Sequence, residues 1–409
     1  MSLAGFVTAE SRRARACPSQ SLSPRQATNR RAITNQPHGY RRARACPSQY
    51  LYVRKTVKRR NQPMLNWGII GAGGIAYVFC NGMRFTDTGQ ISAVASRTPA
   101  RREKLANDFN IPRQYDSYEA LLADEDVDVV YISTIHPLHA EWAIKAAEAK
   151  KHILVEKPIS MNHAEASAMI EAARANDVFL MEAFMYRCHP QIEKVVQLIQ
   201  EGEIGELLVI RATFSHRVDF NPDSRIFNHE MGGGGILDLG CYTASMVRKM
   251  AGAADNKPFL NPISVKANGK LTSTGVDGIA SATLKFENGI IGEIFCAVEC
   301  RVGSTVTLYG SEGTLTIPQP WLPSSACRQA KQPLPHDTEF PTASFYVDIH
   351  RTGDASERFV PVDKDLFTYE AEMVANHIAE RQAPAMPWDD TLGNMQLLDA
   401  WREEIGVVV

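Results

Sequence analysis

The stretch LNWGIIGAGGIA, residues 65–76, decides the fold of this chain of 409 residues. Its first half is a short apolar run that ends at a glycine cluster, which is typical of a buried strand. Its second half, GAGGIA, matches the pattern G-x-G-x-x-A, in which the glycines permit a tight turn and a close approach of the backbone to a pyrophosphate. The residues of this turn that we expect to bind a dinucleotide are Gly71, Gly73, Gly74, Ile75 and Ala76.

The chain that follows favours this interpretation over an ordinary glycine-rich turn between a strand and a helix. A helical stretch runs from the turn to about Arg84, and apolar runs then alternate with helical stretches. The runs lie at 91–96, 127–134, 152–157 and 178–183, and the helical stretches lie at 139–150 and 162–176. Near-continuously apolar runs separated by helices indicate a doubly wound parallel sheet that is covered on both faces. We therefore predict a Rossmann dinucleotide-binding domain over residues 64–186.

The end of the second apolar run selects the cofactor. An NAD site usually has an Asp or Glu there, roughly 20 residues past the glycines, for the ribose 2′-hydroxyl. This chain has Ser96, Arg97 and Thr98 instead. With no carboxylate to repel a 2′-phosphate, Arg97 is able to pair with that phosphate or to stack on the adenine; a solvated arginine at a helix start is the plainer alternative. We expect NADP, bound in part by Ser96 and Arg97, and keep NAD as the second choice.

Polar side chains gather where the predicted parallel strands end. Ligands of such sheets bind outside the carboxyl ends of the strands. At these ends the sequence places Ser133, Thr134, His136, His139, Glu156, Lys157 and Glu182. A lysine at the end of a buried strand is costly unless it has a function. Adjacent residues of a strand point to opposite faces, which argues against a simple ion pair between Glu156 and Lys157. Pro158 follows directly and is a candidate for a cis peptide bond.

After Arg187 the pattern changes. A helical stretch at about 190–202 is followed by β-rich runs that are separated by Gly, Asn and Asp and alternate partly between apolar and polar residues. Two helical stretches, at about 366–381 and 389–405, close the chain. We predict an α/β protein whose Rossmann sheet is joined to an α+β domain, residues 187–409, with a large, mostly antiparallel open sheet. This domain is expected to bind substrate and to join subunits, and its C-terminal helices to pack back on the Rossmann domain.

The stretch HEMGGGGILDLGCYTASMVRKM, residues 229–250, is the second informative segment. Four glycines, 232–235, let the backbone pass where side chains would collide with a substrate or a nicotinamide. The helix that we expect next carries Asp238 and Tyr242, which lie four residues apart and therefore on one face. Together they could orient a sugar-like hydroxyl. From the spacing alone, an acid near a helix N-terminus and a partly buried core tyrosine remain the plainer interpretation.

Five motifs in order now resemble one family. They are the G-x-G-x-x-A turn, STIHPLH (133–139), VEKPIS (155–160), MEAFMYRCHP (181–190) and GGGGILDLGCY (232–242). From about Met64 to Val409 the chain resembles the Gfo/Idh/MocA family, which includes glucose–fructose oxidoreductase and inositol dehydrogenase. RFVPV, TYEAEMVANHIAE and EEIGV look most like the branch with dimeric dihydrodiol dehydrogenase, NADP-dependent D-xylose dehydrogenase and glucose–fructose oxidoreductase.

The resemblance implies roles for individual residues. Lys157 would be the catalytic lysine, Tyr242 its partner at the reacting oxygen, and Asp238 a residue that binds or orients substrate. The further residues implied or expected at the cofactor are Thr134, His136, His139, Glu156, Lys157 and Arg187, with Glu156 at the nicotinamide ribose and Arg187 nearby. Family members often have asparagine at position 136, so His136 departs from the pattern. Many members have histidine at position 242, and the tyrosine here fits the named branch.

The function implied is hydride transfer between NADP and a secondary or anomeric hydroxyl of a sugar or cyclic diol, with Lys157 as the acid and base. Burial and the positive nicotinamide would both favour the neutral amine that accepts a proton. A non-catalytic NADP-sensing regulator of the same fold is the alternative, and an imine or enone reductase of the biliverdin type is a third. The sequence does not name the substrate, and further pocket candidates are Phe184, Tyr186, His216, Arg225 and His229.

Residues 1–63 differ from the rest in composition. They hold 14 basic residues and one acid, so the remaining chain carries a net charge of −15 within a total of −2. The sequence RRARACPSQ occurs at 12–20 and again at 41–49. We expect a disordered basic tail. A transit peptide fits its composition, and translated repetitive DNA upstream of a start at Met64 fits the duplication.

Composition also limits the partners. No segment approaches the roughly 18 consecutive apolar residues of a membrane span, and no nucleic-acid-binding motif is present. The eight cysteines are scattered, with no CxxC pair and no histidine pair at zinc-site spacing. We therefore expect a cytoplasmic protein with reduced thiols, no metal, and neither a nucleic acid nor a membrane as partner. A homodimer or homotetramer through the open sheet of the second domain is expected.

Overall fold

A six-stranded parallel sheet forms the core of residues 64–186, as the alternation of apolar runs and helical stretches predicts. The computed structural model describes residues 64–350 and 352–408, so the predicted basic tail lies outside the described residues. The strands follow the order β3-β2-β1-β4-β5-β6, which is that of a Rossmann fold. Their bounds are β1 Leu65–Ile70, β2 Gly89–Ala95, β3 Arg113–Tyr115, β4 Val129–Ile132, β5 His152–Glu156 and β6 Leu180–Ala183.

Five helices cover this sheet. Every residue of β4 and β6 is buried, because helices lie over both faces. The helices are α1 Gly74–Met83, α2 Pro99–Phe109, α3 Tyr118–Leu122, α4 His139–Glu148 and α5 His163–Asn176. Their ends follow from local sequence. At the start of α5, Asn162 accepts a hydrogen bond from the Glu165 N–H and Glu165 accepts one from the Met161 N–H, each at 3.0 Å.

The second sheet has eight strands in the order β14-β13-β12-β11-β7-β10-β9-β8. All neighbours are antiparallel except β7 and β10, which confirms the predicted mostly antiparallel sheet. The strands are β7 Leu207–Ser215, β8 Ser264–Leu271, β9 Asp277–Lys285, β10 Ile291–Ala297, β11 Val306–Gly310, β12 Gly313–Ile317, β13 Ala343–Ile349 and β14 Asp354–Val360.

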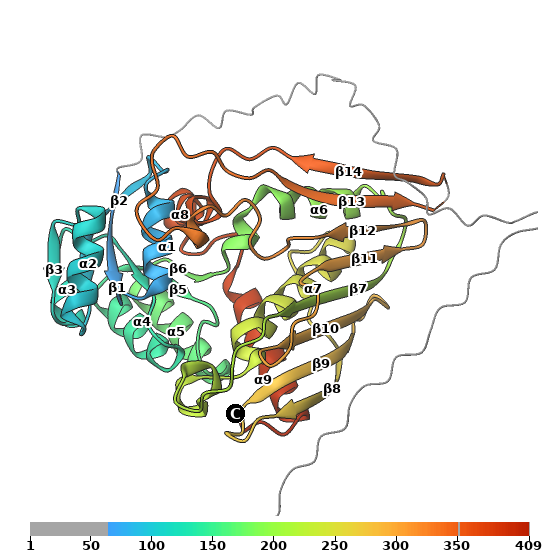
Figure 1. Cartoon of the computed structure of the whole chain (residues 1–409), viewed down its shortest axis with the longest axis horizontal. Coiled ribbons are helices and arrows are strands. Elements are labelled where there is room, and N and C mark those ends of the chain that lie inside the picture. The colour runs from blue at the N-terminus through green and yellow to red at the C-terminus, as the bar shows by residue number, and fades with distance from the viewer. Residues whose placement is uncertain (1–63, 351, 409) are drawn as a thin grey trace, which may run out of the picture. The chain divides into compact units, whose positions relative to one another are not determined.

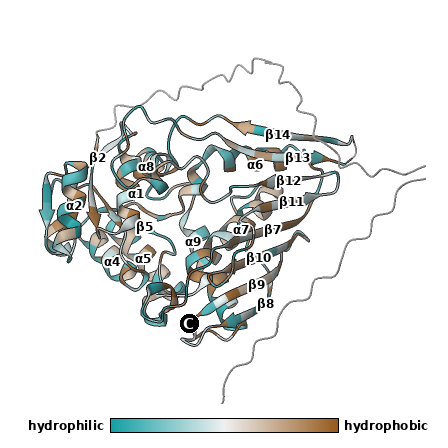
Figure 2. Ribbon diagram, in the orientation of Figure 1, coloured by the Kyte–Doolittle hydropathy of each residue, from teal (hydrophilic) through white to brown (hydrophobic). Residues whose placement is uncertain are grey.

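The helices of the second half are α6 Pro190–Gln200, α7 Cys241–Ala254, α8 Leu366–His377 and α9 Trp388–Glu404. Of these, α6, α7 and α9 lie along one face of this sheet, whereas α8 packs on α1 of the first half. Helix α7 packs on β7 and β10, and α9 packs on β8 (Figure 1). Buried and half-exposed residues alternate along β10, as expected of a strand with one covered face. Figure 2 shows apolar residues concentrated between the layers, whereas the outer helix α2 is mainly hydrophilic.

Short helical turns connect these elements and carry several site residues. They are η1 His136–Leu138, η2 Met185–Cys188, η3 Arg225–Phe227, η4 His229–Met231, η6 Cys327–Gln329 and η7 Ile378–Glu380, all 3-10 helices, and η5 Ile236–Gly240, a π-helix. In the part of the chain that the structure covers, no helix combines the length and the apolar character needed to cross a membrane.

The C-terminal elements pack on the Rossmann sheet as well as on the second one. Helix α8 packs on α1, where Thr368 donates from its hydroxyl to the Gly82 carbonyl at 2.8 Å. Helix α9 packs on α5, and its Trp388 donates from the indole nitrogen to the Leu180 carbonyl at 2.9 Å. The edge strand β6 also donates from the Leu180 N–H to the Arg381 carbonyl. The described residues consequently form a single compact unit.

Candidate active site

The glycine turn after β1 leaves room for a ligand at the start of α1. Gly71 has a φ of +97°, and a Cβ there would lie 3.1 Å from the Ser133 carbonyl oxygen, so a side chain is excluded. Among the described residues, no heavy atom apart from the adjoining backbone lies within 4 Å of a Cβ placed on Gly73 or Gly74, and no side chain caps the first turn of α1. The uncapped N–H groups of that turn and the open volume beside them fit a pyrophosphate.

The predicted adenosine end of the site has an exposed cation and no carboxylate. Behind the turn, Ile75 is half-buried and Ala76 is buried. Ser96 is buried, and its hydroxyl accepts a hydrogen bond from the backbone N–H two residues further on. Arg97 is exposed, with its guanidinium 5.5 Å from the centre of the Tyr118 ring. A guanidinium held by a cation–π contact at the end of β2 keeps its donors free for an anion.

The loop after β4 holds the predicted residues Thr134, His136 and His139. His139 is buried between two carbonyls, with Nδ1 at 3.0 Å from Pro158 O and Nε2 at 3.2 Å from Thr134 O. Burial lowers the pKa of His139 to about 4. His136 contacts the Gly232 carbonyl through Nδ1 at 3.0 Å. The Thr134 hydroxyl is buried without a hydrogen-bond partner in the described residues, so it is available to a ligand. The rings of His136 and His139, in contrast, contact backbone carbonyl groups of the protein.

Lys157 lies at the edge where the parallel strands end. It follows β5 directly, and the Lys157–Pro158 peptide bond is cis. Its side chain is 14% exposed. The amine donates to the Asp238 carbonyl oxygen at 2.8 Å and lies 3.9 Å from the Asp238 carboxylate oxygen Oδ1. It also lies 4.8 Å from the centre of the Tyr242 ring. The structure thus brings together the lysine, the aspartate and the tyrosine that the sequence singles out.

Tyr242 is held in an aromatic cluster. Its hydroxyl donates to the Met185 sulfur at 3.7 Å, while the face of its ring is turned toward the Lys157 amine. Burial raises the pKa of Tyr242 well above its ordinary value, so the phenol stays protonated. The aromatic rings that surround it within 6 Å are those of Phe184, Tyr186, Phe214 and Trp321.

Asp238 lies in the π-helical turn η5, and α7 begins only at Cys241. The expectation of one regular helix through Asp238 and Tyr242 is therefore wrong at its start, although both residues still reach Lys157. Asp238 Oδ1 accepts a hydrogen bond from Arg225 Nη2 at 2.9 Å. Burial alone would raise the pKa of Asp238, but the charges of Lys157 and Arg225 outweigh burial and hold that pKa well below its ordinary value. Asp238 is an anion at neutral pH.

Glu156 is turned into the protein. One carboxylate oxygen accepts a hydrogen bond from the Tyr131 hydroxyl at 2.5 Å, and the other accepts the Lys157 backbone N–H at 3.2 Å. Burial raises its pKa. Glu182 is also buried, which raises its pKa to about 8, and accepts the Ile159 N–H. Neither carboxyl pairs with the lysine side chain, in line with the opposite-face argument.

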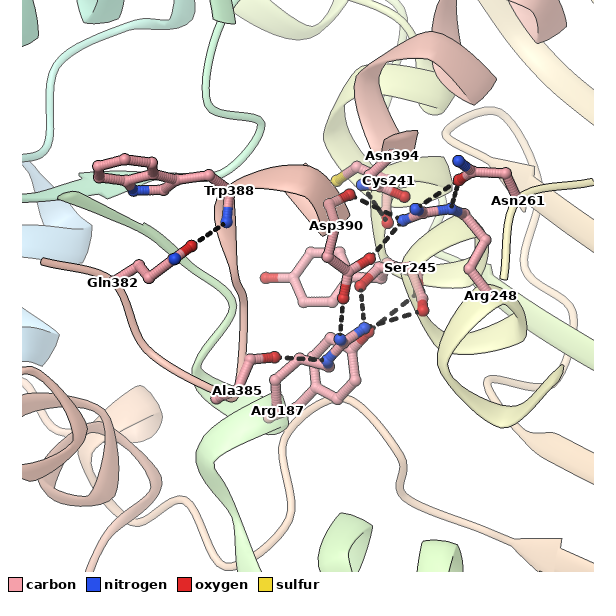
Figure 3. A network of polar contacts seen from close by, with 12 residues as sticks. Arg187, Cys241, Ser245, Arg248, Asn261, Gln382, Ala385, Trp388, Asp390 and Asn394 are labelled. Carbon is pink, nitrogen blue, oxygen red and sulfur yellow. Dashed lines mark hydrogen bonds and ion pairs between the residues drawn. The ribbon is translucent and has the colours of Figure 1, made fainter. Parts of the chain in front are cut away.

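Arg187 lies in a buried network rather than at an open surface (Figure 3). Its side chain is fully buried and donates from Nε to Ala385 O at 3.1 Å and from Nη1 to Ser245 Oγ at 2.8 Å. Nη2 pairs with Asp390 of α9, whose other oxygen pairs with Arg248 of α7 at 2.5 Å. Because its donors are directed at protein groups, we propose that Arg187 positions η2 and α7 instead of contacting the cofactor.

The glycine run sets the place of Asp238. Gly234 has a φ of +105°, and a Cβ there would lie 2.3 Å from Oδ1 of the buried Asp277. The other oxygen of Asp277 accepts the Ile236 N–H at 2.7 Å, at the start of the π-helical turn. Asp277 thus caps the turn that carries Asp238 and leaves no room for a side chain at position 234.

Gly234→Ala is expected to destabilise the protein by roughly 3 kcal/mol, because backbone strain and a collision with Asp277 add. The matched control is Gly275→Ala, whose φ is +83° with no heavy atom within 4 Å of the added carbon. Strain alone should lower its stability by about 1–2 kcal/mol. Urea unfolding measures both free energies, and equal losses in the two variants would contradict the role of Asp277.

Several of these residues escape sequence reasoning. Asp277, Asp390 and Tyr131 are remote in sequence from the groups that they hold, and no local pattern marks them. Arg225, in the loop before the glycine run, is among the further pocket candidates from the sequence, but its ion pair with Asp238 was not predicted. In residues 64–350 and 352–408, no group of three or more His, Cys, Asp or Glu side chains is arranged to hold a metal ion.

Comparison with known proteins agrees with this architecture. Residues 65–184 match the family described as "Oxidoreductase family, NAD-binding Rossmann fold", and residues 192–316 match the "GFO/IDH/MocA C-terminal domain". Trans-1,2-dihydrobenzene-1,2-diol dehydrogenase of Danio rerio is 32% identical over 349 residues, which are 84% of this chain and 98% of the relative. The enzyme of the same name from Mus musculus is 32% identical over 351 residues, which are 84% of this chain and 97% of the relative.

Two solved structures share the fold. KijD10, a 3-ketoreductase from Actinomadura kijaniata in complex with NADP and TDP-benzene, is 25% identical with a TM-score of 0.72, covering 84% of this chain and 98% of its own. The aldose-aldose oxidoreductase from Caulobacter crescentus complexed with glycerol is 21% identical with a TM-score of 0.72, covering 84% of this chain and 97% of its own. From its family matches and its dihydrodiol dehydrogenase relatives, the chain belongs to the Gfo/Idh/MocA family of NAD(P)-binding oxidoreductases.

Proposed function

We propose that this protein is an NADP-dependent dehydrogenase or reductase that acts on a hydroxyl group of a sugar or cyclic diol, with Lys157 as the acid and base. The observation that carries the proposal is the position of Lys157. Its amine stands at the carboxyl edge of the parallel sheet, partly exposed, and faces the Asp238 carbonyl and the Tyr242 ring. An amine at the ligand-binding edge of a Rossmann sheet is placed for proton transfer to a bound substrate.

The residues present fit a dinucleotide. The glycine turn offers uncapped N–H groups and an open volume for the pyrophosphate, and the Thr134 hydroxyl has no hydrogen-bond partner among the described residues. NADP is supported by Arg97, which is exposed at the end of β2 where an NAD site would have a carboxylate. The structure of the 25% identical relative KijD10 in complex with NADP supports the same choice. When bound, the cofactor would supply the hydride acceptor or donor.

The chain's own residues would handle the proton and the oxygen. In the oxidation of an alcohol, the substrate carbon loses a hydride and the oxygen loses a proton, which leaves a carbonyl. The neutral Lys157 amine would take that proton, and in the reverse reaction the protonated amine would return it. Asp238, as an anion, would accept a hydrogen bond from a neighbouring substrate hydroxyl. The ring of Tyr242 stabilises the protonated amine through the cation–π contact.

A polyhydroxylated ring is the substrate class that the surroundings favour. Asp238 offers a hydroxyl acceptor, and the half-buried Phe214 ring stands next to Tyr242, 5.2 Å between centres. An apolar face beside a polar acceptor suits a ring with hydroxyls on one side. The relatives named as dihydrodiol dehydrogenases and the fold relative named as an aldose-aldose oxidoreductase fall in this class.

A screen of aldoses and cyclic diols with NAD⁺ and with NADP⁺, followed by the absorbance of the reduced cofactor, tests the proposal. Turnover of at least one compound with a preference for NADP⁺ is the expected result. Tight NADPH binding with no turnover in either direction, the carbonyl products included, would reject it in favour of a non-catalytic NADP sensor.

Arg97→Gln is expected to raise the KM for NADP⁺ roughly ten- to a hundredfold and to leave the KM for NAD⁺ nearly unchanged. The reason is the loss of a charge-assisted hydrogen bond to the 2′-phosphate, about 1.5–3 kcal/mol. The control is Arg101→Gln, which lies four residues further along the chain and is exposed on α2. Equal effects on both cofactors would show that Arg97 does not read the phosphate.

We also propose that the protein forms a homo-oligomer through the outer face of its second sheet. Helices α6, α7 and α9 cover the opposite face of this sheet (Figure 1). The outer face has a hollow lined by residues of β7, β8, β9 and β10, among them Thr213, Asn268, Thr283 and Phe295. The molar mass from light scattering tests this proposal, and the mass of a single chain would exclude it.

A further inference from the structure

Two cations share the Asp238 carboxylate, and they hold it unequally. Arg225 Nη2 donates to Oδ1 at 2.9 Å, whereas the Lys157 amine lies 3.9 Å from the same oxygen. The amine has its own hydrogen bond at 2.8 Å, to the backbone carbonyl of Asp238. The strong contact of the carboxylate is therefore with the arginine, and the lysine is left with a carbonyl and an aromatic ring.

This division matters because a carboxylate in direct contact would favour the charged lysine. An opposite charge within about 4–6 Å stabilises the charged form, and the effect grows as the distance shrinks. A base must be able to lose its proton near the working pH. Arg225 draws the carboxylate away from the amine and places a second positive charge beside it, so the amine receives less electrostatic stabilisation from Asp238 than direct contact would give.

Arg225 itself is held from the Rossmann side by His136. The His136 Nδ1 contacts the Gly232 carbonyl at 3.0 Å, and Nε2 lies 3.5 Å from Arg225 Nη1. Burial, and next the charges of His139, Arg225 and Lys157, lower the pKa of His136 well below its ordinary value. A neutral ring that donates from Nδ1 to the carbonyl can accept at Nε2 from the guanidinium.

The loop that carries Arg225 fits closely against His136. Gly232 has a φ of +69°, and a Cβ there would lie 2.7 Å from the Met161 sulfur and 3.0 Å from the His136 ring. The glycine run therefore packs tightly against the same His136 ring that contacts Arg225. His136, which departs from the asparagine often found in the family, has a role in this contact.

We propose that Arg225 is a positioning residue that holds Asp238 off the Lys157 amine, with His136 as its anchor on the Rossmann side. The proposal rests on the proposed function of Lys157 as the acid and base. The titratable and charged groups near Lys157, from all the elements packed around it, are Glu156, His136, His139, His216, Arg225, Asp238, Cys241 and Tyr242, and Arg328 of η6 lies near three of these, Glu156, His216 and Tyr242. Of the two carboxyl groups in this set, Glu156 is engaged by Tyr131, which leaves Asp238 as the one free to approach the amine once Arg225 is removed.

The test compares Arg225→Met with wild type by the pH dependence of kcat/KM for alcohol oxidation. The acidic limb is expected to move to higher pH by about one unit or more, because a cation is lost and a carboxylate approaches the amine. Arg225→Lys keeps the positive charge, so its acidic limb should lie closer to that of wild type than the limb of Arg225→Met. His136→Ala should produce a smaller shift in the same direction as Arg225→Met. Arg217→Met is the matched control, since Arg217 lies on the same loop, is 72% exposed and pairs only loosely with Asp219 at 3.7 Å.

A second readout does not depend on turnover. The rate at which an amine-reactive reagent labels Lys157, followed by mass spectrometry of its peptide, tracks the neutral amine. At a given pH this rate should fall about tenfold in Arg225→Met and stay unchanged in Arg217→Met. An unchanged labelling rate, or a uniform loss of kcat/KM at every pH, would overturn the proposal. Absence of turnover in wild type together with the expected labelling change would instead reject the proposed function and keep the role of Arg225.

Discussion

Lys157→Met is expected to lower kcat for the cognate alcohol by about a hundred- to ten-thousandfold, the contribution typical of one general acid or base. Methionine keeps most of the length and volume of the side chain, so packing against Tyr242 is preserved while the proton acceptor is lost. NADPH should still bind with an affinity close to that of wild type, because the turn at the start of α1 does not involve this side chain. Steady-state kinetics and cofactor fluorescence give the two quantities.

The control for this variant is Lys145→Met on α4. Lys145 also lies over an aromatic ring, that of Trp142, at 4.2 Å, but it is on the exposed surface and remote from the strand ends. Its replacement should leave kcat unchanged. If Lys157→Met retained most of the wild-type activity, Lys157 would not be the acid and base, and Tyr242 would become the next candidate.

Asp390→Asn is expected to cause the largest loss of stability, about 3–5 kcal/mol, which is typical when one partner of a buried ion pair is removed. Asp390 pairs with Arg187 and with Arg248, and all three side chains are fully buried (Figure 3). Asparagine has nearly the same volume but no charge, so two guanidinium groups would be left buried without an anion.

The free energy of unfolding in urea measures this effect. Glu141→Gln is the control, because Glu141 forms an ion pair with Lys145 at 2.6 Å on the exposed surface of α4. Its replacement should produce no measurable change, since surface ion pairs contribute little. A loss below about 1 kcal/mol for Asp390→Asn would mean that water or a shifted side chain compensates for the missing charge.

The sequence predicts the Rossmann strands well because their signal is local. Each of β1, β2, β4, β5 and β6 contains a short, mainly apolar run, and the glycine turn fixes where the first strand ends. Helix α2 and the strands β13 and β14 were not predicted. PARREKLANDF is mostly polar, because α2 buries few residues, and the two strands face solvent for much of their length.

The site was predicted in part for the same reason. Lys157, Asp238 and Tyr242 belong to short motifs, so the sequence marks them and the structure brings them together. The π-helical turn under Asp238 is set by Asp277, which lies 39 residues further along the chain, and no local pattern encodes it. Arg187 illustrates the converse. Its position in a motif suggested a cofactor contact, and only the long-range partner Asp390 reveals a buried ion pair.

The anion between the two arginines has a consequence for biosynthesis. Asp390 belongs to α9, the last helix in the described chain, and the same helix and the turn before it bond to the edge strand β6 of the first sheet. A ribosome makes the chain from the N-terminus, so α7 and η2 emerge long before the carboxylate that neutralises them. Until α9 has been made, Arg187 and Arg248 of the nascent chain would lack the carboxylate that neutralises them. We therefore expect the active site to assemble only after α9 has been synthesised, and the Rossmann segment alone to be a poor folding unit.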